Sequence, residues 1–273
     1  MKRKLFCEIS PLTYRISQMK NRLFRKLKDM FGSTCLTKEK STEKLPILIY
    51  KHSSLIRRTL GNVDLALQEN KATNLSISAP HVNGILIRPG ETFSFWNLVG
   101  QPTKKKGYKE GLTISNAKTM AGIGGGMCQF TNLIHWMVLH TPLEITEHHH
   151  HDGFDLFPDF NRQIPFGTGT SIAYNYIDYR FKNTTDITFQ LVVYVTDTHL
   201  CGELRGTDAL PVKYHIESEN EHFVSENGVV YRVGEVYRTC IDKRTGNVVE
   251  KLLLRNNHAK VMYDTKHLNV VEI

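Results

Sequence analysis

Cys128 follows three consecutive glycines, Gly124, Gly125 and Gly126, and precedes a long apolar run. Because that run predicts a helix, the thiol stands in its first turn, where unpaired backbone N–H groups favour the thiolate. Glycines let the backbone approach a substrate closely, and their N–H groups, together with Gln129, can hold an oxyanion. We interpret these residues as a cysteine nucleophile site. The alternative is a tight turn followed by a small buried cysteine.

A cysteine nucleophile needs a base, and four consecutive histidines, residues 148–151, follow downstream. We predict that His151 or His149 is this base. His135 is a poorer candidate, because seven residues of helix place it roughly 10 Å from the thiol along the axis. The order Cys, His, polar residue is that of papain-like folds, which predicts a third residue that orients the imidazole. The candidates for this third residue are Asp178, Asp155 and Asn175.

Two non-catalytic interpretations of the same residues stay open. Four histidines suggest a metal, but zinc sites need defined spacings and neighbours on a strand point to alternate faces, so we expect no metal and no cofactor. A glycine loop before a helix is also an anion site, suited to a carboxylate or a pyrophosphate. It is not a P-loop, because Cys and Gln stand where Lys and Ser or Thr are required. The predicted ligand-binding residues are Gly124, Gly125, Gly126 and Asn132.

The helix that must position the thiol is predicted from the run Phe130 to Leu139, which is apolar nearly all round a 3.6-residue period. Such a helix is typical of a buried position. Cys128, Asn132 and His135 fall on one narrow polar stripe of it. We expect this stripe to face a cleft or a buried polar contact.

The first 31 residues hold nine Lys and Arg and two acidic residues, so seven of the eight net positive charges lie there. Ile16, Met19, Leu23, Leu27 and Met30 recur at helical spacing, which predicts a basic amphipathic helix. Such a helix can lie peripherally on an anionic membrane, or it can dock on the protein's own core. We expect no nucleic acid partner, since no zinc finger, RNA-binding or helix-turn-helix pattern accompanies the charge.

The location of the protein is predicted from what the sequence lacks. No apolar segment approaches the roughly 18 to 20 residues that span a bilayer, and the start of the chain has no apolar signal core. Five cysteines, an odd number without metal-type spacing, fit a reducing compartment. We therefore expect a cytoplasmic protein, with peripheral contact at the inner membrane face if the leader helix binds lipid.

We predict an α+β fold with a mostly antiparallel sheet, packed on the buried helix that starts at Cys128, and with N-terminal helices. The segment 47–79 is expected to be helical, with Asn62 as a cap. Strands are expected at 85–88, 92–95, 112–115, 171–181 and 187–196, with 183–186 a hairpin loop and 242–247 a turn between later short strands. The predicted organisation is a leader helix at 1–31, a linker at 32–45, a core domain at 46–200 and a β-rich extension at 201–273.

Several short motifs are similar to those of the VanW family. The resemblance covers about residues 45 to 260, and its Gly-Gly-Gly-x-Cys-Gln element is specific. The matching motifs are Asn83-Gly84, Pro89 to Phe95, Val99-Gly100, Gly107-Tyr108, Gly124 to Gln129, Glu147 with His149 and His151, and Asp178 with Asn183.

The resemblance implies a bacterial accessory protein of glycopeptide (vancomycin B-type) resistance, in cells whose peptidoglycan precursors end in D-alanyl-D-lactate. It supplies no mechanism. Many family members are exported and carry peptidoglycan-binding or G5 modules, which are absent from this sequence. Many also have an aspartate where this chain has Gly169. If that aspartate orients the histidine elsewhere, the role falls here to Asp155 or Asp178, or the chemistry is impaired.

Three functions follow from these patterns. The first is a cysteine-dependent hydrolase or acyl transferase that acts on an amide or ester of peptidoglycan or its precursor, with Cys128 as nucleophile. The second is a non-catalytic module that binds an anionic peptidoglycan precursor at the glycine loop. The third is a scaffold for resistance enzymes at the membrane surface, which would depend on residues 1–31.

Overall fold

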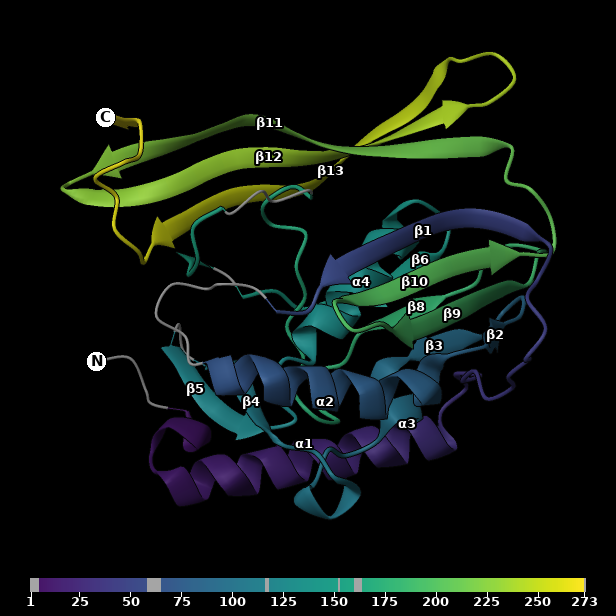
Figure 1. Cartoon of the computed structure of the whole chain (residues 1–273), viewed down its shortest axis with the longest axis horizontal. Coiled ribbons are helices and arrows are strands. Elements are labelled where there is room, and N and C mark those ends of the chain that lie inside the picture. The colour runs from purple at the N-terminus through teal and green to yellow at the C-terminus, as the bar shows by residue number, and fades with distance from the viewer. Residues whose placement is uncertain (1–4, 58–64, 116–117, 152, 160–163, 273) are drawn as a thin grey trace.

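Figure 1 shows the computed structural model, which describes residues 5–57, 65–115, 118–151, 153–159 and 164–272. The helices are η1 (Phe6–Glu8), α1 (Pro11–Phe31), α2 (Leu65–Val82), α3 (Phe95–Val99), η2 (Lys104–Lys106) and α4 (Cys128–Leu139). The strands of the first half are β1 (Ile47–Leu55), β2 (Ile85–Ile87), β3 (Thr92–Ser94), β4 (Glu110–Ser115), β5 (Lys118–Ile123) and β6 (Glu144–Glu147). Those of the second half are β7 (Phe154–Asp155), β8 (Arg180–Lys182), β9 (Phe189–Val195), β10 (His199–Gly206), β11 (Val212–Glu226), β12 (Val229–Asp242), β13 (Val248–Val261) and β14 (Val270–Glu272).

The central sheet has the strand order β1-β10-β9-β2, and all of its pairs are antiparallel. Helix α4 packs on this sheet at very short range. A Cβ atom at Gly202 of β10 would lie only 2.6 Å from Met137 Cε of the helix, so a larger residue there would have to displace the Met137 side chain. The expectation of a buried helix that starts at Cys128 and lies against an antiparallel sheet is confirmed.

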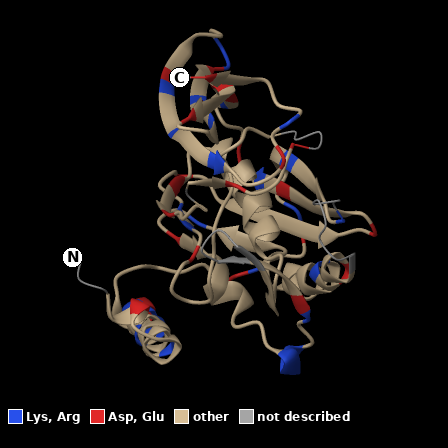
Figure 2. Cartoon of the chain, turned by 90° about the vertical axis from the view of Figure 1, so that its left-hand side faces the viewer, with Lys and Arg blue, Asp and Glu red and all other residues tan. Residues whose placement is uncertain are grey.

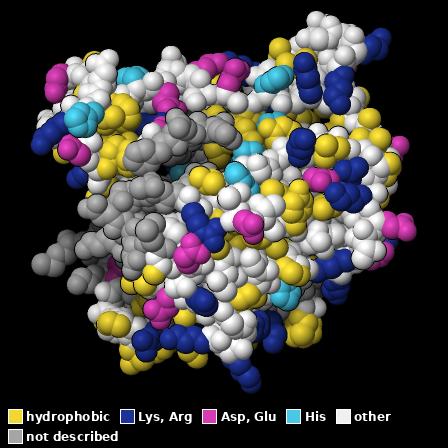
Figure 3. Space-filling model, viewed as in Figure 1, with side chains coloured by type: hydrophobic (Ala, Val, Ile, Leu, Met, Phe, Trp, Pro, Cys, Tyr) yellow, Lys and Arg dark blue, Asp and Glu magenta, His cyan; other side chains and the backbone are white. Residues whose placement is uncertain are grey.

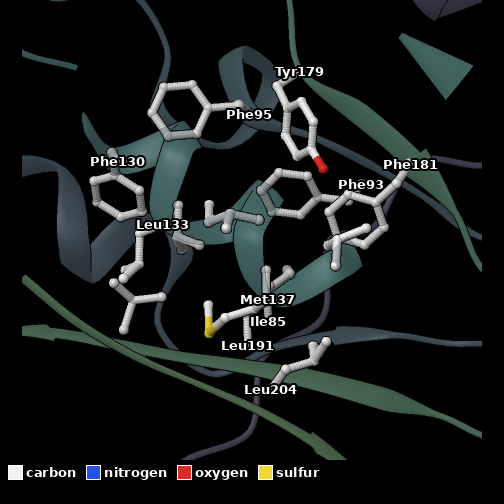
Figure 4. Packing of buried hydrophobic residues seen from close by; sticks show 14 of the residues in the cluster. Ile85, Phe93, Phe95, Phe130, Leu133, Met137, Tyr179, Phe181, Leu191 and Leu204 are labelled. Atoms are coloured by element: carbon white, nitrogen blue, oxygen red, sulfur yellow. The ribbon is translucent and has the colours of Figure 1, made fainter. Parts of the chain in front are cut away.

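A second sheet, β3-β8-β6, encloses the core from the other side. Phe93 of β3 and Phe181 of β8 stack with ring centroids 4.7 Å apart, and both are fully buried. Figure 4 shows these rings close to Phe95, Leu133 and the side chains of the central sheet. The core is therefore made by α4 and two sheets together with buried side chains of α2 and α3, which holds α4 in place.

The C-terminal strands form a third sheet, β14-β11-β12-β13-β7, which extends across the top of Figure 1. Its strands β11, β12 and β13 have 14 or 15 residues each and are longer than the short strands that we expected. Asn227 and Gly228, both with positive φ, make the tight turn between β11 and β12. The sheet is tied to the body by Asn257, whose Nδ2 donates to Phe166 O at 3.1 Å, and by Arg238, which donates to Thr141 O.

The α+β prediction is confirmed, but several predicted elements differ. The first part of the predicted helix 47–79 is wrong, because 47–55 is strand β1, and its proposed cap Asn62 lies outside the described residues. Within 171–181 only the end is a strand, and 183–186 joins two different sheets rather than a hairpin. The turn at 242–247 is confirmed. The predicted boundary at residue 200 falls inside β10, which belongs to the central sheet.

Helix α1 starts with Ser10, whose Oγ accepts from Thr13 N–H at 3.2 Å, and with Pro11 at its first position. It lies along the lower side of the body in Figure 1. The predicted linker 32–45 runs beside β2 and β3, to which Leu36 and Lys40 form isolated bridges. Among the helices of the described part, none has the length and apolar composition needed to cross a membrane.

Candidate functional site

The three glycines before α4 are required by close packing. A Cβ atom at Gly125 would lie 2.1 Å from the carbonyl carbon of Gly111, and one at Gly126 would lie 2.2 Å from Lys71 Cγ. A Cβ atom at Gly124 would likewise lie 2.6 Å from Pro102 Cβ. Gly124 and Gly126 also have φ of 76° and 90°, which side-chain-bearing residues rarely adopt. The loop is thus packed against three neighbouring segments.

The N–H groups of this loop are already used inside the protein. Those of Gly124, Gly125 and Gly126 donate to Lys109 O, Gly122 O and Leu112 O, at 3.0, 3.0 and 2.8 Å. The Gln129 N–H donates to Gly126 O at 3.0 Å, and the Gln129 side chain donates to Ser54 Oγ and Leu55 O, both at 2.9 Å. The structure therefore does not offer these groups to an oxyanion or an anionic ligand, contrary to our prediction.

The thiol and the histidine segment, residues 148–151, do meet. Cys128 Sγ lies 4.0 Å from His151 Nε2, and both residues are partly exposed. His149 points elsewhere, because its Nε2 lies 3.2 Å from Glu147 Oε1. Of the two predicted bases, His151 is thus the one beside the sulfur. The distance is at the outer limit of a sulfur hydrogen bond, and such contacts tighten when substrate binds.

The polar stripe of α4 faces the histidine segment and the chain just before Ser171. Asn132 Oδ1 accepts from the N–H and Oγ1 of Thr170 at 2.7 and 2.8 Å. One turn further, the His135 ring stacks on the His148 ring at 4.3 Å, and His135 Nδ1 lies 3.0 Å from the Tyr179 hydroxyl. The predicted stripe therefore holds the histidine segment along α4 through His135, and Asn132 holds the chain at Thr170 against the same helix.

Gly169 lies next to these residues. A Cβ atom there would lie 3.7 Å from His150 Nε2 and 3.8 Å from Asn132 Oδ1, both ordinary contact distances. Its carbonyl oxygen is 2.9 Å from His148 Nε2. A side chain at this position would therefore point at the histidine segment, which is where the family resemblance leads one to expect an aspartate.

The candidates for orienting the base lie in other contacts. Asp178 is buried, and its carboxylate accepts from Ser94 Oγ at 2.6 Å, from Arg180 Nε at 2.8 Å and from the backbone N–H of Trp96 and Tyr179. Those bonds hold the start of α3 and strand β8. This carboxylate therefore fixes the fold beside the site.

Asp155 and Asn175 also form hydrogen bonds to residues other than Cys128 and His151. Asp155 Oδ2 accepts from the Tyr263 hydroxyl at 2.8 Å and from Arg232 at 3.4 Å, within the C-terminal sheet region. Asn175 Nδ2 donates to Arg22 O of α1 at 3.3 Å. The hydrogen bonds of all three predicted orienting residues therefore join parts of the fold to one another.

Burial raises the pKa of the Cys128 thiol, although the backbone N–H groups of Ile172 and of Cys128 itself face the sulfur and act in the opposite direction. This is the reverse of the thiolate that we predicted from the helix start. A thiol with a raised pKa is protonated at neutral pH. The thiol therefore needs an adjacent base to remove its proton before it can act as a nucleophile, and His151 is placed to be that base.

His135 carries no charge at neutral pH. Its burial, with a smaller effect of His148 and His150 nearby, holds its pKa well below the usual value. It lines a small cavity of about 200 Å³ between α4 and strands β12 and β13, together with His148 and Val236. Cys128 does not line this cavity, which lies further along the helix. We assign His135 to packing, as expected of the poorer candidate for the base.

The histidine side chains diverge along the segment. His148 faces Gly169, His149 faces Glu147 and His151 faces Cys128. In the described part of the chain no three His, Cys, Asp or Glu side chains are grouped so that they could hold a metal ion.

Some residues of the site were not predicted from the sequence. Ile172 contributes a backbone N–H to the sulfur, and Thr170 holds Asn132. Glu147 accepts bonds from Arg25, from the Asp178 N–H and from His149, so it anchors the start of the histidine segment. A backbone contact such as that of Ile172 leaves no signal in a sequence.

The sequence comparisons agree with the motifs. A family model described as VanW like protein matches residues 70–205. The vancomycin B-type resistance protein VanW of Enterococcus faecalis is 35% identical over 233 residues, which is 85% of this chain and 84% of that protein. The uncharacterized protein YoaR of Bacillus subtilis is 30% identical over 118 residues, 42% of this chain and 36% of that protein. No solved structure matches significantly.

Proposed function

Because the chain belongs to the VanW family, we propose that it is an accessory protein of vancomycin B-type glycopeptide resistance that uses a Cys128–His151 pair on peptidoglycan or its precursors. The link to resistance comes from the name of the Enterococcus faecalis relative, which aligns over most of both chains. The observation that supports the chemistry is the 4.0 Å separation of Cys128 Sγ and His151 Nε2 at the start of α4.

The proposed reaction is acyl transfer from an amide or ester. His151 Nε2 takes the thiol proton while Cys128 Sγ bonds to the carbonyl carbon of the substrate. The imidazolium then gives this proton to the leaving amine or alcohol as the carbon–nitrogen or carbon–oxygen bond breaks, which leaves a thioester. Water, or an amine acceptor, then attacks the thioester carbonyl carbon while His151 Nε2 takes its proton. The carbon–sulfur bond breaks, the acyl group leaves on the acceptor, and the imidazolium returns the proton to Cys128 Sγ. Every proton is accounted for by the same imidazole, and the raised pKa of the thiol is why a base is needed.

The oxyanion of this reaction needs hydrogen-bond donors near the sulfur. The glycine N–H groups are used in the loop, so we assign this role to the backbone N–H groups of Cys128 and Ile172, which face Sγ. Both are held by rigid neighbours, since Cys128 begins α4 and Thr170 is bound to Asn132. The glycine loop then fixes the start of the helix and does not touch the substrate.

The non-catalytic alternative needs the glycine loop to bind an anion. Its amides already have partners, so the structure gives this alternative less support than the Cys–His pair. The two functions are separated by Cys128→Ser. A binding module would keep its function, whereas a thiol nucleophile would lose it because a hydroxyl is a much weaker nucleophile in this setting.

The test is genetic complementation in a glycopeptide-resistant bacterium that lacks its own homologue, with expression of each variant matched by immunoblot. We expect Cys128→Ala, Cys128→Ser and His151→Ala to lose the contribution of the protein to resistance, and His149→Ala to retain most of it. His149 is the matched control because it lies two residues from His151 and faces Glu147. Full function of Cys128→Ala would end the enzyme proposal.

A further inference from the structure

Helix α1 is attached to the body through its polar side. Arg22 Nε donates to Tyr174 O at 3.1 Å, Arg25 forms a two-pronged ion pair with Glu147, and Asp29 accepts two bonds of 2.7 Å from Arg180. Arg22, Arg25 and Asp29 are spaced three and four residues apart, so they lie on one face of the helix. The body therefore covers the charged side of α1.

The apolar side of α1 faces away from the body. Of the exposed large apolar side chains of α1, six share one face and keep between 39% and 67% of their surface exposed, and in the described helix none of the residues is buried. At about 100° per residue they form one continuous stripe along the helix. They are Leu12, Ile16, Met19, Leu23, Leu27 and Met30. A helix that docks by charges and exposes its apolar stripe is the reverse of an ordinary surface helix.

Basic residues border this stripe on both sides. At about 100° per residue, Arg15 and Lys26 lie along one border of the stripe and Lys20 lies along the other. All three are exposed. Figure 2 views α1 nearly end-on at the edge of the molecule, with Lys and Arg along it. Figure 3 shows basic and apolar side chains along the lower edge of the molecule, where Figure 1 places both α1 and the loop that holds η2. Exposed Leu5, Phe6 and Ile9 lie just before the helix.

We propose that α1 lies in the surface of an anionic lipid bilayer, with its apolar stripe among the acyl chains and Arg15, Lys20 and Lys26 at the level of the headgroups. An apolar stripe bordered by cations is the arrangement that interfacial helices use, and anionic lipid is the surface whose charge complements it. The ion pairs of Arg25 and Asp29 hold the body on the opposite side of the helix. The protein therefore binds the membrane as one rigid unit.

The sequence left open whether α1 docks on the protein's own core, and the structure argues against this alternative. The face needed for core docking is the one that points outward, while the face toward the body is occupied by ion pairs. The inference does not rest on the proposed chemistry, since Cys128 and His151 take no part in these contacts. Cys128→Ala should bind vesicles like the native protein.

The experiment is co-sedimentation of the full chain with vesicles of phosphatidylglycerol and phosphatidylcholine, and with vesicles of phosphatidylcholine alone. We expect binding to the anionic vesicles only. The double variant Met19→Glu, Leu23→Glu should bind at least about tenfold more weakly, because two anchoring side chains become charged. Lys20→Gln with Lys26→Gln should weaken binding by about tenfold and reduce its salt dependence.

The matched control is Val248→Glu with Val249→Glu, which adds the same two charges at exposed apolar positions of strand β13. This control should bind like the native chain, and circular dichroism should show all variants folded, since the changed residues are exposed. Equal binding to both vesicle types, or undiminished binding by the Met19, Leu23 variant, would overturn the proposal. So would a dimer in solution that this variant dissociates and that does not bind vesicles.

Discussion

The glycine loop before α4 and the histidine segment after it are the two most conspicuous runs in the sequence, yet the structure uses them in opposite ways. The loop is packed against neighbouring segments, with its N–H groups bonded to backbone carbonyls and with no room for a Cβ atom at Gly125. The histidine segment instead presents successive side chains to different neighbours, one of which is the thiol. A run of small residues here serves packing, while a run of titratable ones brings a single imidazole to the site.

The largest effect should come from the loop. Gly125→Val would place side-chain atoms inside the backbone of Gly111, so we expect the protein to lose more than about 4 kcal/mol of stability or to fail to fold. Urea unfolding followed by circular dichroism measures this loss. Gly169→Ala is the control, because its added Cβ would have only ordinary contacts, and it should change stability by less than about 0.5 kcal/mol. A stable Gly125→Val variant would show that the loop is free to move.

Acid should destabilise the helix that faces the histidine segment. Burial holds the pKa of His135 well below its usual value and lowers the pKa of His140 to about 4. The unfolded chain therefore takes up these protons first, and stability present above pH 6.5 is lost as pH falls, by about 1.4 kcal/mol per pH unit for each histidine. Between pH 6.5 and pH 5 each should remove about 2 kcal/mol.

Urea unfolding at pH 7.5, 6 and 5 measures this slope. The variants His135→Gln and His140→Gln should each reduce the slope of stability against pH by about 1.4 kcal/mol per pH unit, because each removes one proton-binding group of the unfolded state. A native protein whose stability is constant over this range would refute the burial of neutral histidines.

Asn132 joins the two sides of the site, and its loss should have an intermediate effect. Asn132→Ala removes the acceptor of two bonds from Thr170, so we expect a loss of about 1 to 3 kcal/mol. The same variant should free the chain that carries Ile172 and lower the contribution to resistance that we propose for the Cys128–His151 pair. Asn132→Asp keeps an acceptor and should recover part of the stability, whereas equal losses for both variants would indicate that Asn132 acts through its volume alone.

The smallest effect should come from the histidine that faces away from the sulfur. His149→Ala removes a partly exposed contact with Glu147, which keeps its bonds to Arg25 and the Asp178 N–H, so the stability loss should be within about 0.5 kcal/mol. Thermal unfolding at pH 7.5 checks this value. A loss comparable to that of Asn132→Ala would place His149 among the residues that hold the segment together.

The thiol itself can be compared with an ordinary cysteine. Alkylation of Cys128 by iodoacetamide, in a chain whose other four cysteines are replaced by Ser or Ala, should titrate at a pH above that of a free thiol, because burial raises its pKa. A midpoint below the free-thiol value would mean that a thiolate–imidazolium pair forms with His151 before substrate binds.

The sequence was sufficient for the parts of the fold that depend on local pattern. The apolar run of α4, its polar stripe and the amphipathic leader were all visible in residue spacing. Strand β1 was mistaken for a helix, although its burial alternates, because its partner β10 lies about 150 residues away. The segment before Tyr179 has strand-like residues, but bonds such as that between Asn132 and Thr170 hold it in a loop.

The site could be predicted to the level of residue type but not of contacts. The thiol, its helix and the group of candidate bases followed from spacing. Which histidine faces the sulfur did not, because that depends on how residues 148–151 turn beside α4. The partners of Asp178 and Asp155 were also invisible, since Ser94, Arg180, Tyr263 and Arg232 come from distant parts of the chain.

The pairing of β1 with β10 has a consequence for anyone who trims this protein. The family match at 70–205 begins after β1 and inside α2, so a fragment cut to it would lack the strand that covers β10. Strand β10 would then be an open sheet edge, with a row of unbonded N–H and C=O groups next to apolar side chains. Such a fragment should aggregate through that edge, and a soluble truncation has to begin before Ile47.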